Sequence, residues 1–174
     1  MKIRIIAGLM AAASFAGHAV AQEPAFPTKP IRFLVGQAPG GATDIIGRLV
    51  ASKMTEVVGQ NVIVENRTGA AGSIAAANVA KSTPDGYTVL VVSSSYAINP
   101  SLYASLPFDP QKDLAPITLI AEAPFLLVVH PSLPVKSVKE LVAMGRKRGD
   151  VLTYGSGGIG SSGHLAGALF ETSA

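Results

Sequence analysis

Short runs of apolar residues alternate, along the first half of the chain, with segments that carry apolar residues at helical spacing. The runs at 31–36, 61–65 and 87–92 are nearly continuous, as is typical of central strands covered on both faces. Helices are expected between them, over about 44–58 and 74–81. The order β-α-β-α-β is that of a parallel sheet with right-handed crossovers, so the sequence predicts an α/β fold.

The second half repeats the unit of strand, small-residue loop and helix. A proline-rich stretch at 99–116 precedes it and reads as a surface connection. Strands are expected at 117–121, 125–129 and 151–154, a helix from the capping box of Ser137 and Glu140 to about Lys147, and a last helix after the loop 155–164.

We therefore divide the chain into lobe I (31–116) and lobe II (117–174). Lobe II stops in mid-helix after three strands, which would leave a short sheet with exposed edges. For this reason we expect the second lobe to be incomplete and the sequence to be a C-terminally truncated fragment of a longer protein.

Loops rich in small residues follow the strands of lobe I, at 36–44, 66–73 and 93–96. Because the carboxyl ends of parallel strands share one edge, these loops should converge on one crevice. The loop 36–44 leads from a strand straight into a helix, for which Thr43 can serve as N-cap. Such a geometry aims backbone N–H groups and the positive end of a helix dipole at one spot, so the sequence predicts an anion site there.

Two glycine patterns suggest nucleotides, and neither is convincing. Gly36-x-x-x-x-Gly41-Ala42-Thr43 nearly matches a P-loop, but Ala42 holds the position of the phosphate-binding lysine, which favours a smaller anion such as a carboxylate. Gly155-x-Gly157-x-x-Gly160 formally matches a dinucleotide fingerprint. The acidic residue that would confirm it falls at or beyond Ala174, and export of the chain also counts against it. No cofactor is predicted.

The N-terminus is typical of a signal peptide. Lys2 and Arg4 are followed by an apolar run and by Ala19-Val20-Ala21, so we expect residues 1–21 to be removed by cleavage near Ala21 and Gln22. Residues 22–30 then form a lead-in to the first strand. An uncleaved membrane anchor is the alternative, although the apolar run is short for a bilayer span.

The charge that remains after cleavage argues against nucleic acid as a partner. Two of the 14 Lys and Arg residues lie in the signal, so the mature chain would have 12 Lys and Arg residues and 11 Asp and Glu residues, a net charge of +1. A nucleic-acid-binding protein would need a basic face. The basic cluster 146–148 lies at an expected helix C-terminus, where cations suit the dipole. The chain has no cysteine, which excludes disulfides and thiolate sites, and of its three histidines His130 and His164 survive cleavage in unrelated contexts. No metal site is predicted.

Catalytic readings need a nucleophile with a base, and no serine lies in a G-x-S-x-G motif. Asp44 could act as a base, but a first-turn carboxylate that braces the loop is the better interpretation, since a base there would repel an anion. His164 follows Ser161 and can bond the loop at a helix start or contact a ligand. Arg67 can pair with a ligand carboxylate or with Glu65.

The motifs of the chain resemble those of the Bug receptors, the periplasmic substrate-binding components of tripartite tricarboxylate transporters. The resemblance covers residues 27–171. Besides the signal, it rests on Ala38-Pro39-Gly40-Gly41-x-Thr43-Asp44, Val64-Glu65-Asn66-Arg67-x-Gly69-Ala70, Pro84-Asp85-Gly86-Tyr87-Thr88, Ala97-Ile98-Asn99-Pro100-Ser101-Leu102-Tyr103 and Ser161-x-x-His164-Leu165-Ala166-Gly167.

The resemblance implies a two-lobed periplasmic binding protein of the Venus flytrap, type II-like kind. A small carboxylate would lie in the cleft, held partly through waters, and membrane permease subunits would be the partner. Carried over onto this sequence, the ligand contacts are Gly40, Gly41, Thr43, Ala70, Gly72, Ser94 and Ser95 from lobe I and Ser156, Gly157, Ser161 and His164 from lobe II. Pro39 and Asp44 would be structural.

The chain departs from the family pattern at three loop positions. Gln37 stands where an aromatic residue is more common, and Ala42 and Ala71 stand in place of frequent glycines. Family members also continue well beyond the length of this chain.

The sequence therefore predicts a periplasmic receptor, not an enzyme, that captures a tricarboxylate, dicarboxylate, amino acid or aromatic acid for a tripartite tricarboxylate transporter. Two alternatives stay open. One is an exported α/β enzyme acting on a small acid, with Asp44, Ser161 or His164 in catalysis. The other is a non-functional truncated remnant.

Overall fold

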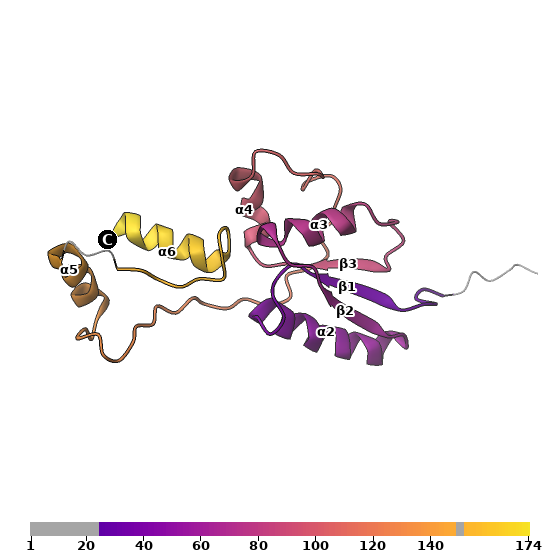
Figure 1. Ribbon diagram of the computed structural model, residues 1–174. Helices are drawn as coiled ribbons and strands as arrows, with labels where there is room; N and C mark the ends of the chain where they lie inside the picture. Colours follow the sequence, from indigo (N-terminus) through magenta and orange to yellow (C-terminus); the bar gives the residue numbers. More distant parts are fainter. Residues whose placement is uncertain (1–24, 149–151) are drawn as a thin grey trace, which may run out of the picture.

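The computed structural model describes residues 25–148 and 152–174 of the 174-residue chain. The predicted signal peptide and its cleavage site lie outside the described residues. The elements in chain order are β1 (Ile31–Val35), α2 (Ala42–Val58), β2 (Val62–Asn66), the 3-10 helix η1 (Ala70–Gly72), α3 (Ser73–Ala80), β3 (Thr88–Val91), α4 (Ser95–Leu102), α5 (Val138–Arg148) and α6 (Ser162–Ser173). Figure 1 shows β1 to α4 gathered into one α/β unit, from which the second half extends to one side.

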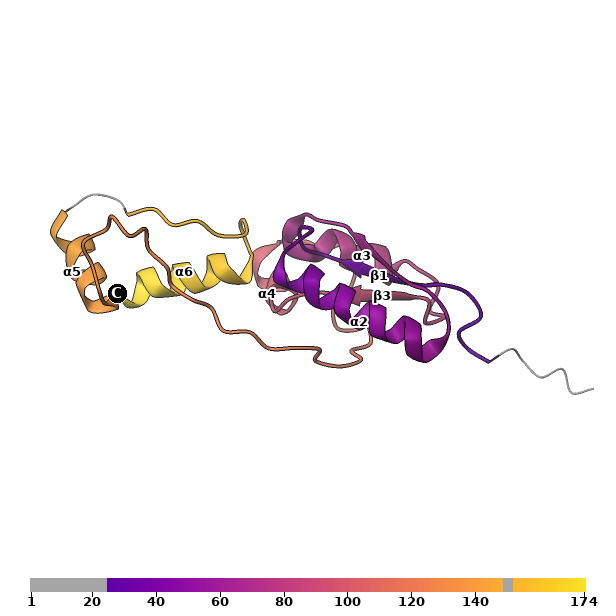
Figure 2. The same ribbon diagram turned by 90° about the horizontal axis from the view of Figure 1, so that it is seen from below.

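The strands form one parallel sheet in the order β2-β1-β3, with β1 in the centre. Phe33 of β1 lies opposite Val64 on one side and Val89 on the other. α2 covers one face of the sheet and α3 covers the other, as both Figure 1 and Figure 2 show. The predicted α/β class and the parallel β-α-β-α-β order are thus confirmed.

The core lies between α2 and the sheet. Ile31, Phe33 and Val35 are spaced by two residues along β1, so their side chains share one face, and all three are buried against Ala51 of α2. Gly47 of α2 faces the same cluster, where a Cβ would lie 3.5 Å from the side chains of Val35 and Val91, an ordinary contact. The continuous apolar strands read from the sequence are therefore those of a covered sheet.

α2 begins earlier than predicted. Gly41, in extended conformation, takes the N-cap position, and Thr43 lies inside the first turn, so the expectation that Thr43 caps the helix is wrong. Gly59 ends the helix in the left-handed conformation with a φ of 70°, as expected of a residue that follows a helix C-terminus.

α4 corrects the expectation that residues 99–116 are irregular from their start. The helix runs over Ser95–Leu102 with Pro100 inside it, although proline removes one helical hydrogen bond. Asn99 compensates through tertiary bonds: its buried amide nitrogen donates to the Ala71 carbonyl (3.2 Å) and to Ser73 Oγ (2.8 Å). These contacts, which no local pattern reveals, hold the helix against η1 and α3.

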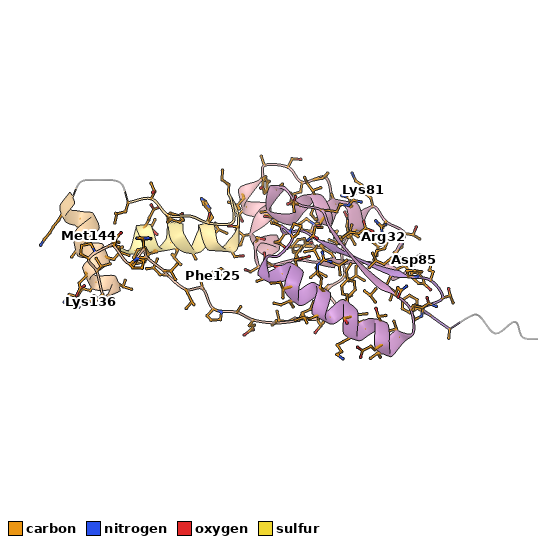
Figure 3. The ribbon with its side chains drawn as sticks, turned by 60° about the horizontal axis from the view of Figure 1, so that its bottom comes forward. Arg32, Lys81, Asp85, Phe125, Lys136 and Met144 are labelled. Carbon is orange, nitrogen blue, oxygen red and sulfur yellow. The ribbon has the colours of Figure 1, made fainter. Side chains whose placement is uncertain are left out.

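The strands expected at 117–121, 125–129 and 151–154 are not formed among the described residues, and Val151 lies outside them. The segment 117–129 is extended and solvent-exposed; Leu126, for example, is 82% exposed. A strand needs a neighbour to satisfy its backbone groups, and in Figure 1 this segment runs as a single trace. Figure 3 shows Phe125 on it, outside the layers that hold Arg32.

The helices of the second half agree with the sequence. Ser137 Oγ accepts from the Glu140 N–H (3.2 Å), as the predicted capping box requires at the start of α5. The Glu140 carboxylate accepts from the N–H of Lys136 (2.7 Å), one residue before the cap, and not from that of Ser137. α6 follows the loop 155–161 as expected. None of the helices that the structure describes is both long and apolar enough to cross a bilayer. The division into lobes I and II stays a prediction.

Candidate functional site

The loops that follow β1, β2 and β3 lie against one another at the carboxyl edge of the sheet. A Cβ built on Gly36 would lie 2.8 Å from the Cα of Gly72, so the backbones of the first two loops are in contact. Gln37 Nε2 donates to Ser93 Oγ (3.2 Å), which joins the first loop to the third. The predicted convergence of the three loops is therefore confirmed.

Asp44 braces the first loop from inside the helix. Its Oδ2 accepts from the Gly40 N–H (2.9 Å) and from Arg48 Nε (3.0 Å), and its Oδ1 accepts from Asn66 Nδ2 (2.9 Å). The carboxylate is buried, and hydrogen bonds from Arg48, then Gly40, then Asn66 lower the pKa of Asp44 to about 2. With both oxygens occupied, Asp44 acts as a structural anchor, not as a free base.

Acid should reveal this anchor. Because the pKa of Asp44 is lower in the folded state than the value of about 3.9 in an unfolded chain, its stabilisation is present above about pH 4 and is lost as the pH falls towards 2. We expect Asp44→Asn to melt several degrees below the wild type at neutral pH, and we expect the two to approach each other in acid. A gap between the melting curves that is the same at both pH values would contradict this role.

The free donors of the first loop are not those of its glycines. The N–H of Gly40 bonds to Asp44, and that of Gly41 bonds to the Ala38 carbonyl (3.2 Å). Among the described residues, the N–H groups of Ala42, Thr43 and Asp44 have no acceptor, as is usual for the first turn of a helix. An anion at this loop would therefore be bound by the first turn of α2.

The second loop holds four successive residues at positive φ: Gly69 (121°), Ala70 (45°), Ala71 (51°) and Gly72 (94°). This conformation costs an alanine about 1–2 kcal/mol, so two of the four positions are strained. The Ala71 carbonyl accepts from Ser95 Oγ (3.2 Å) and from Asn99, which holds the strained turn in place. Non-glycine residues kept in this region often mark functional loops.

The start of α6 also reaches this edge. Ser162 Oγ lies 2.8 Å from Ser94 Oγ, and Gly160 is buried. A Cβ on Gly160 would lie 3.1 Å from both Ala71 Cβ and Leu102 Cδ1. A loop from the second half of the chain therefore lies directly on the loops of the first half, as the meeting of α6 and α4 in Figure 1 also shows.

The predicted contact residues of the second half fall into two groups. Ser161 caps α6 by accepting from the His164 N–H (3.2 Å), and His164 Nδ1 is buried with no partner among the described residues. Ser156 and Gly157 lie in the exposed part of the loop. The histidine is thus a helix-start residue with one ring nitrogen still to be satisfied.

The predicted contact residues of the first half differ in their exposure and in whether their hydrogen-bonding groups are already used. Gly72 and Ser95 are buried, and the hydroxyl of Ser95 is used by Ala71 and Ser93. Thr43 is half-buried, and Ala70 and Ser94 are exposed. Arg67 pairs with Glu65 (3.2 Å), which is one of the two alternatives that the sequence leaves open.

Sequence reasoning missed two residues that hold the site together. Arg48 lies four residues after Asp44, a spacing that places an acid and a base on one side of a helix and could have predicted their pairing. Asn66, at the end of β2, donates to Asp44 and to the Gln37 carbonyl (3.1 Å), and only the sheet order brings it there.

Comparison with known proteins adds the family. Residues 46–174 match the family described as "Tripartite tricarboxylate transporter family receptor". The chain belongs to this family. The resemblance seen in the sequence is confirmed, and because the family is one of binding receptors, so is the expectation that the chain is not an enzyme.

Several solved structures resemble the chain. The Rpa4515 protein of R. palustris, with adipate, is 40% identical and superposes with a TM-score of 0.80 over 84% of this chain and 50% of its own. MatC of Rhodopseudomonas palustris, with bound malate, is 32% identical with a TM-score of 0.74 over 84% and 50%. The periplasmic binding protein BugD is 31% identical with a TM-score of 0.72 over 85% and 50%. The chain spans about half the length of the relatives it matches.

Proposed function

We propose that the chain is part of a periplasmic receptor that captures a small carboxylate and delivers it to the membrane permease of a tripartite tricarboxylate transporter. The observation that carries this proposal is the first turn of α2. Its N–H groups at residues 42–44 have no acceptor among the described residues, and they follow directly on the first of the three loops, which meet one another and the start of α6 at this edge.

A carboxylate suits this edge better than a phosphorylated ligand. The first turn offers neutral donors and the positive helix end, and Ala42 places no cation where a P-loop has its lysine. Arg48, which lies in the second turn of α2, is already bonded to Asp44 and Asn66. Adipate and malate, which two solved relatives hold, are ligands of the proposed kind.

The ligand contacts that we propose are the predicted ones, with the roles that their surroundings allow. Gly41 and Thr43, which are half-buried, and Gly40, Ala70 and Ser94, which are exposed, would face the ligand directly or through waters. Ser161 and His164 would close the site from the second half, together with Ser156 and Gly157. Gly72 and Ser95, which are buried, would shape the loops, as would Pro39 and Asp44. We also propose export to the periplasm, with cleavage near Ala21 and Gln22.

Binding can be tested with the protein purified at the full length that its gene encodes. Malate, adipate, citrate and ATP would be compared by thermal shift and then by calorimetry. We expect carboxylates, and not ATP, to raise the melting temperature. A rise with ATP alone would overturn the proposal.

Thr43→Val removes one hydroxyl from the first turn of α2. Loss of one hydrogen bond of about 1 kcal/mol should weaken carboxylate binding by roughly five- to tenfold, with little change in the melting temperature of the free protein. Thr172→Val, which removes the hydroxyl of an exposed threonine in the last turn of α6, is the matched control and should leave affinity unchanged. Equal affinities for both variants and the wild type would remove Thr43 from the site.

A further inference from the structure

Gln37 stands at the end of a chain of hydrogen bonds that crosses the three loops. Gln37 Nε2 lies 3.2 Å from Ser93 Oγ, Ser93 Oγ lies 2.8 Å from Ser95 Oγ, and Ser95 Oγ lies 3.2 Å from the Ala71 carbonyl. A carbonyl can only accept, so the hydroxyl of Ser95 donates to Ala71. Each hydroxyl has one proton, so Ser93 must donate to Ser95 and must accept from Gln37.

This order fixes which way the amide of Gln37 points. The end that faces Ser93 must be the NH₂ group, and Oε1 therefore faces away from this series of hydrogen bonds. Oε1 is buried and has no hydrogen-bond donor among the described residues. A buried acceptor without a donor is destabilising, because it has lost its hydrogen bonds to water and gained none in return, so a donor is missing at this oxygen. Hydrogen bonds along the chain polarise the amide and make Oε1 a stronger acceptor.

The neighbouring loops also hold Gln37 in place. Its backbone carbonyl accepts from Asn66 Nδ2 (3.1 Å), and its Nε2 would lie 3.2 Å from a Cβ at Gly72. The residue belongs to the loop 36–41, which leads directly into the free N–H groups of the first turn of α2. One loop therefore supplies an acceptor and, a few residues on, a set of donors.

We propose that Gln37 is a specificity-determining residue that accepts a hydrogen bond, through Oε1, from a hydroxyl or ammonium group of the ligand. This inference rests on the proposed function, in which the ligand carboxylate occupies the first turn of α2. A carboxylate has no proton to give to Oε1 at neutral pH, so the ligand must carry a second group that donates. The ligand class is thus a hydroxy- or amino-carboxylate rather than a plain diacid.

The test compares acids that differ by one donor. Malate and succinate differ by a hydroxyl, and aspartate and succinate differ by an ammonium group. Calorimetry on the full-length wild-type protein should give at least one of the donor-bearing acids an affinity about tenfold higher than that of succinate, the equivalent of about 1.4 kcal/mol for one satisfied hydrogen bond. Whichever acid shows the preference identifies the donor as hydroxyl or ammonium. Equal affinities for all three acids would overturn the inference without any variant.

Gln37→Met keeps the length of the side chain and removes its acceptor. We expect the preference for the donor-bearing acid to disappear, with succinate affinity kept within about twofold because the first turn of α2 is intact. Ser93→Ala, a second test variant, removes the neighbour that orients the amide and should reduce the preference only in part. A preference that persists in Gln37→Met would overturn the role of Gln37 while leaving carboxylate binding in place. Failure of every acid to bind the wild type would instead overturn the proposed function, and the inference with it.

Discussion

Replacing Phe33 with alanine is expected to cost the chain about 3–5 kcal/mol of folding free energy, a large part of the roughly 5–15 kcal/mol that a typical domain has. Phe33 is 3% exposed in the central strand and belongs to the cluster that contacts α2. β1 is paired on both sides, opposite Val64 and Val89 at this position. Because the backbone cannot move inward without breaking one of the two ladders, the hole left by the ring would stay largely empty.

Urea unfolding of the 174-residue chain, followed by circular dichroism, measures this loss. Phe125→Ala is the matched control, because it deletes the same atoms from a side chain that is 63% exposed on the extended segment. We expect that control to change stability by no more than about 0.5 kcal/mol. Equal losses for the two variants would show that Phe125 is packed in solution, which would contradict its exposed position.

The contrast between these two phenylalanines also explains which strands could be predicted from the sequence and which could not. β1 was predicted within one residue because all its side chains except that of Arg32 are buried, which leaves a nearly continuous apolar run in the sequence. The segment around Phe125 carries the same kind of run, but a strand also requires a neighbour, and pairing is not a local property. Hydrophobicity alone could not distinguish the two.

The predictions of the start of α2 and of the short helix α4 were wrong for a related reason. Thr43 is a better N-cap residue than Gly41 by propensity, yet Gly41 is the N-cap of α2. Asp44 is then the third helical residue, from which its carboxylate reaches back to the Gly40 N–H. Pro100 disfavours a helix, but the hydrogen bonds from Asn99 to Ala71 and Ser73 stabilise α4 in spite of it. In both cases a tertiary hydrogen bond overrides a local preference.

The candidate site was predictable at the level of loops and not at the level of side chains. Parallel strands alone dictate that the three loops meet, and they do. Which groups remain free depends on internal bonds: the N–H groups of Gly40 and Gly41 are used, and Oε1 of Gln37 is left over. Sequence motifs locate a binding edge, whereas the pattern of satisfied and unsatisfied groups determines what the edge can bind.

Gly36→Ala is the change that we expect to damage this edge most. The new methyl would lie 2.8 Å from Gly72 Cα and 3.3 Å from the Gly72 carbonyl oxygen, and both are backbone atoms that no rotamer change can move. The first and second loops must separate, at a cost of about 1–3 kcal/mol for overpacking. Since the ligand would be bound between these loops, we expect carboxylate affinity to fall at least about tenfold, the equivalent of about 1.4 kcal/mol.

Gly47→Ala is the matched control, because it adds the same methyl group to the same α/β unit at a position where the methyl does not clash. It therefore separates the clash between the two loops from any general effect of replacing glycine by alanine. Its Cβ would meet the side chains of Val35 and Val91 at 3.5 Å, an ordinary contact, and alanine suits a helix interior better than glycine does. We expect unchanged or slightly higher stability and unchanged affinity for this control, measured by thermal unfolding and calorimetry. Full affinity in Gly36→Ala would mean that the contact between the two loops is not needed for binding, and the ligand would then have to lie elsewhere on the sheet edge.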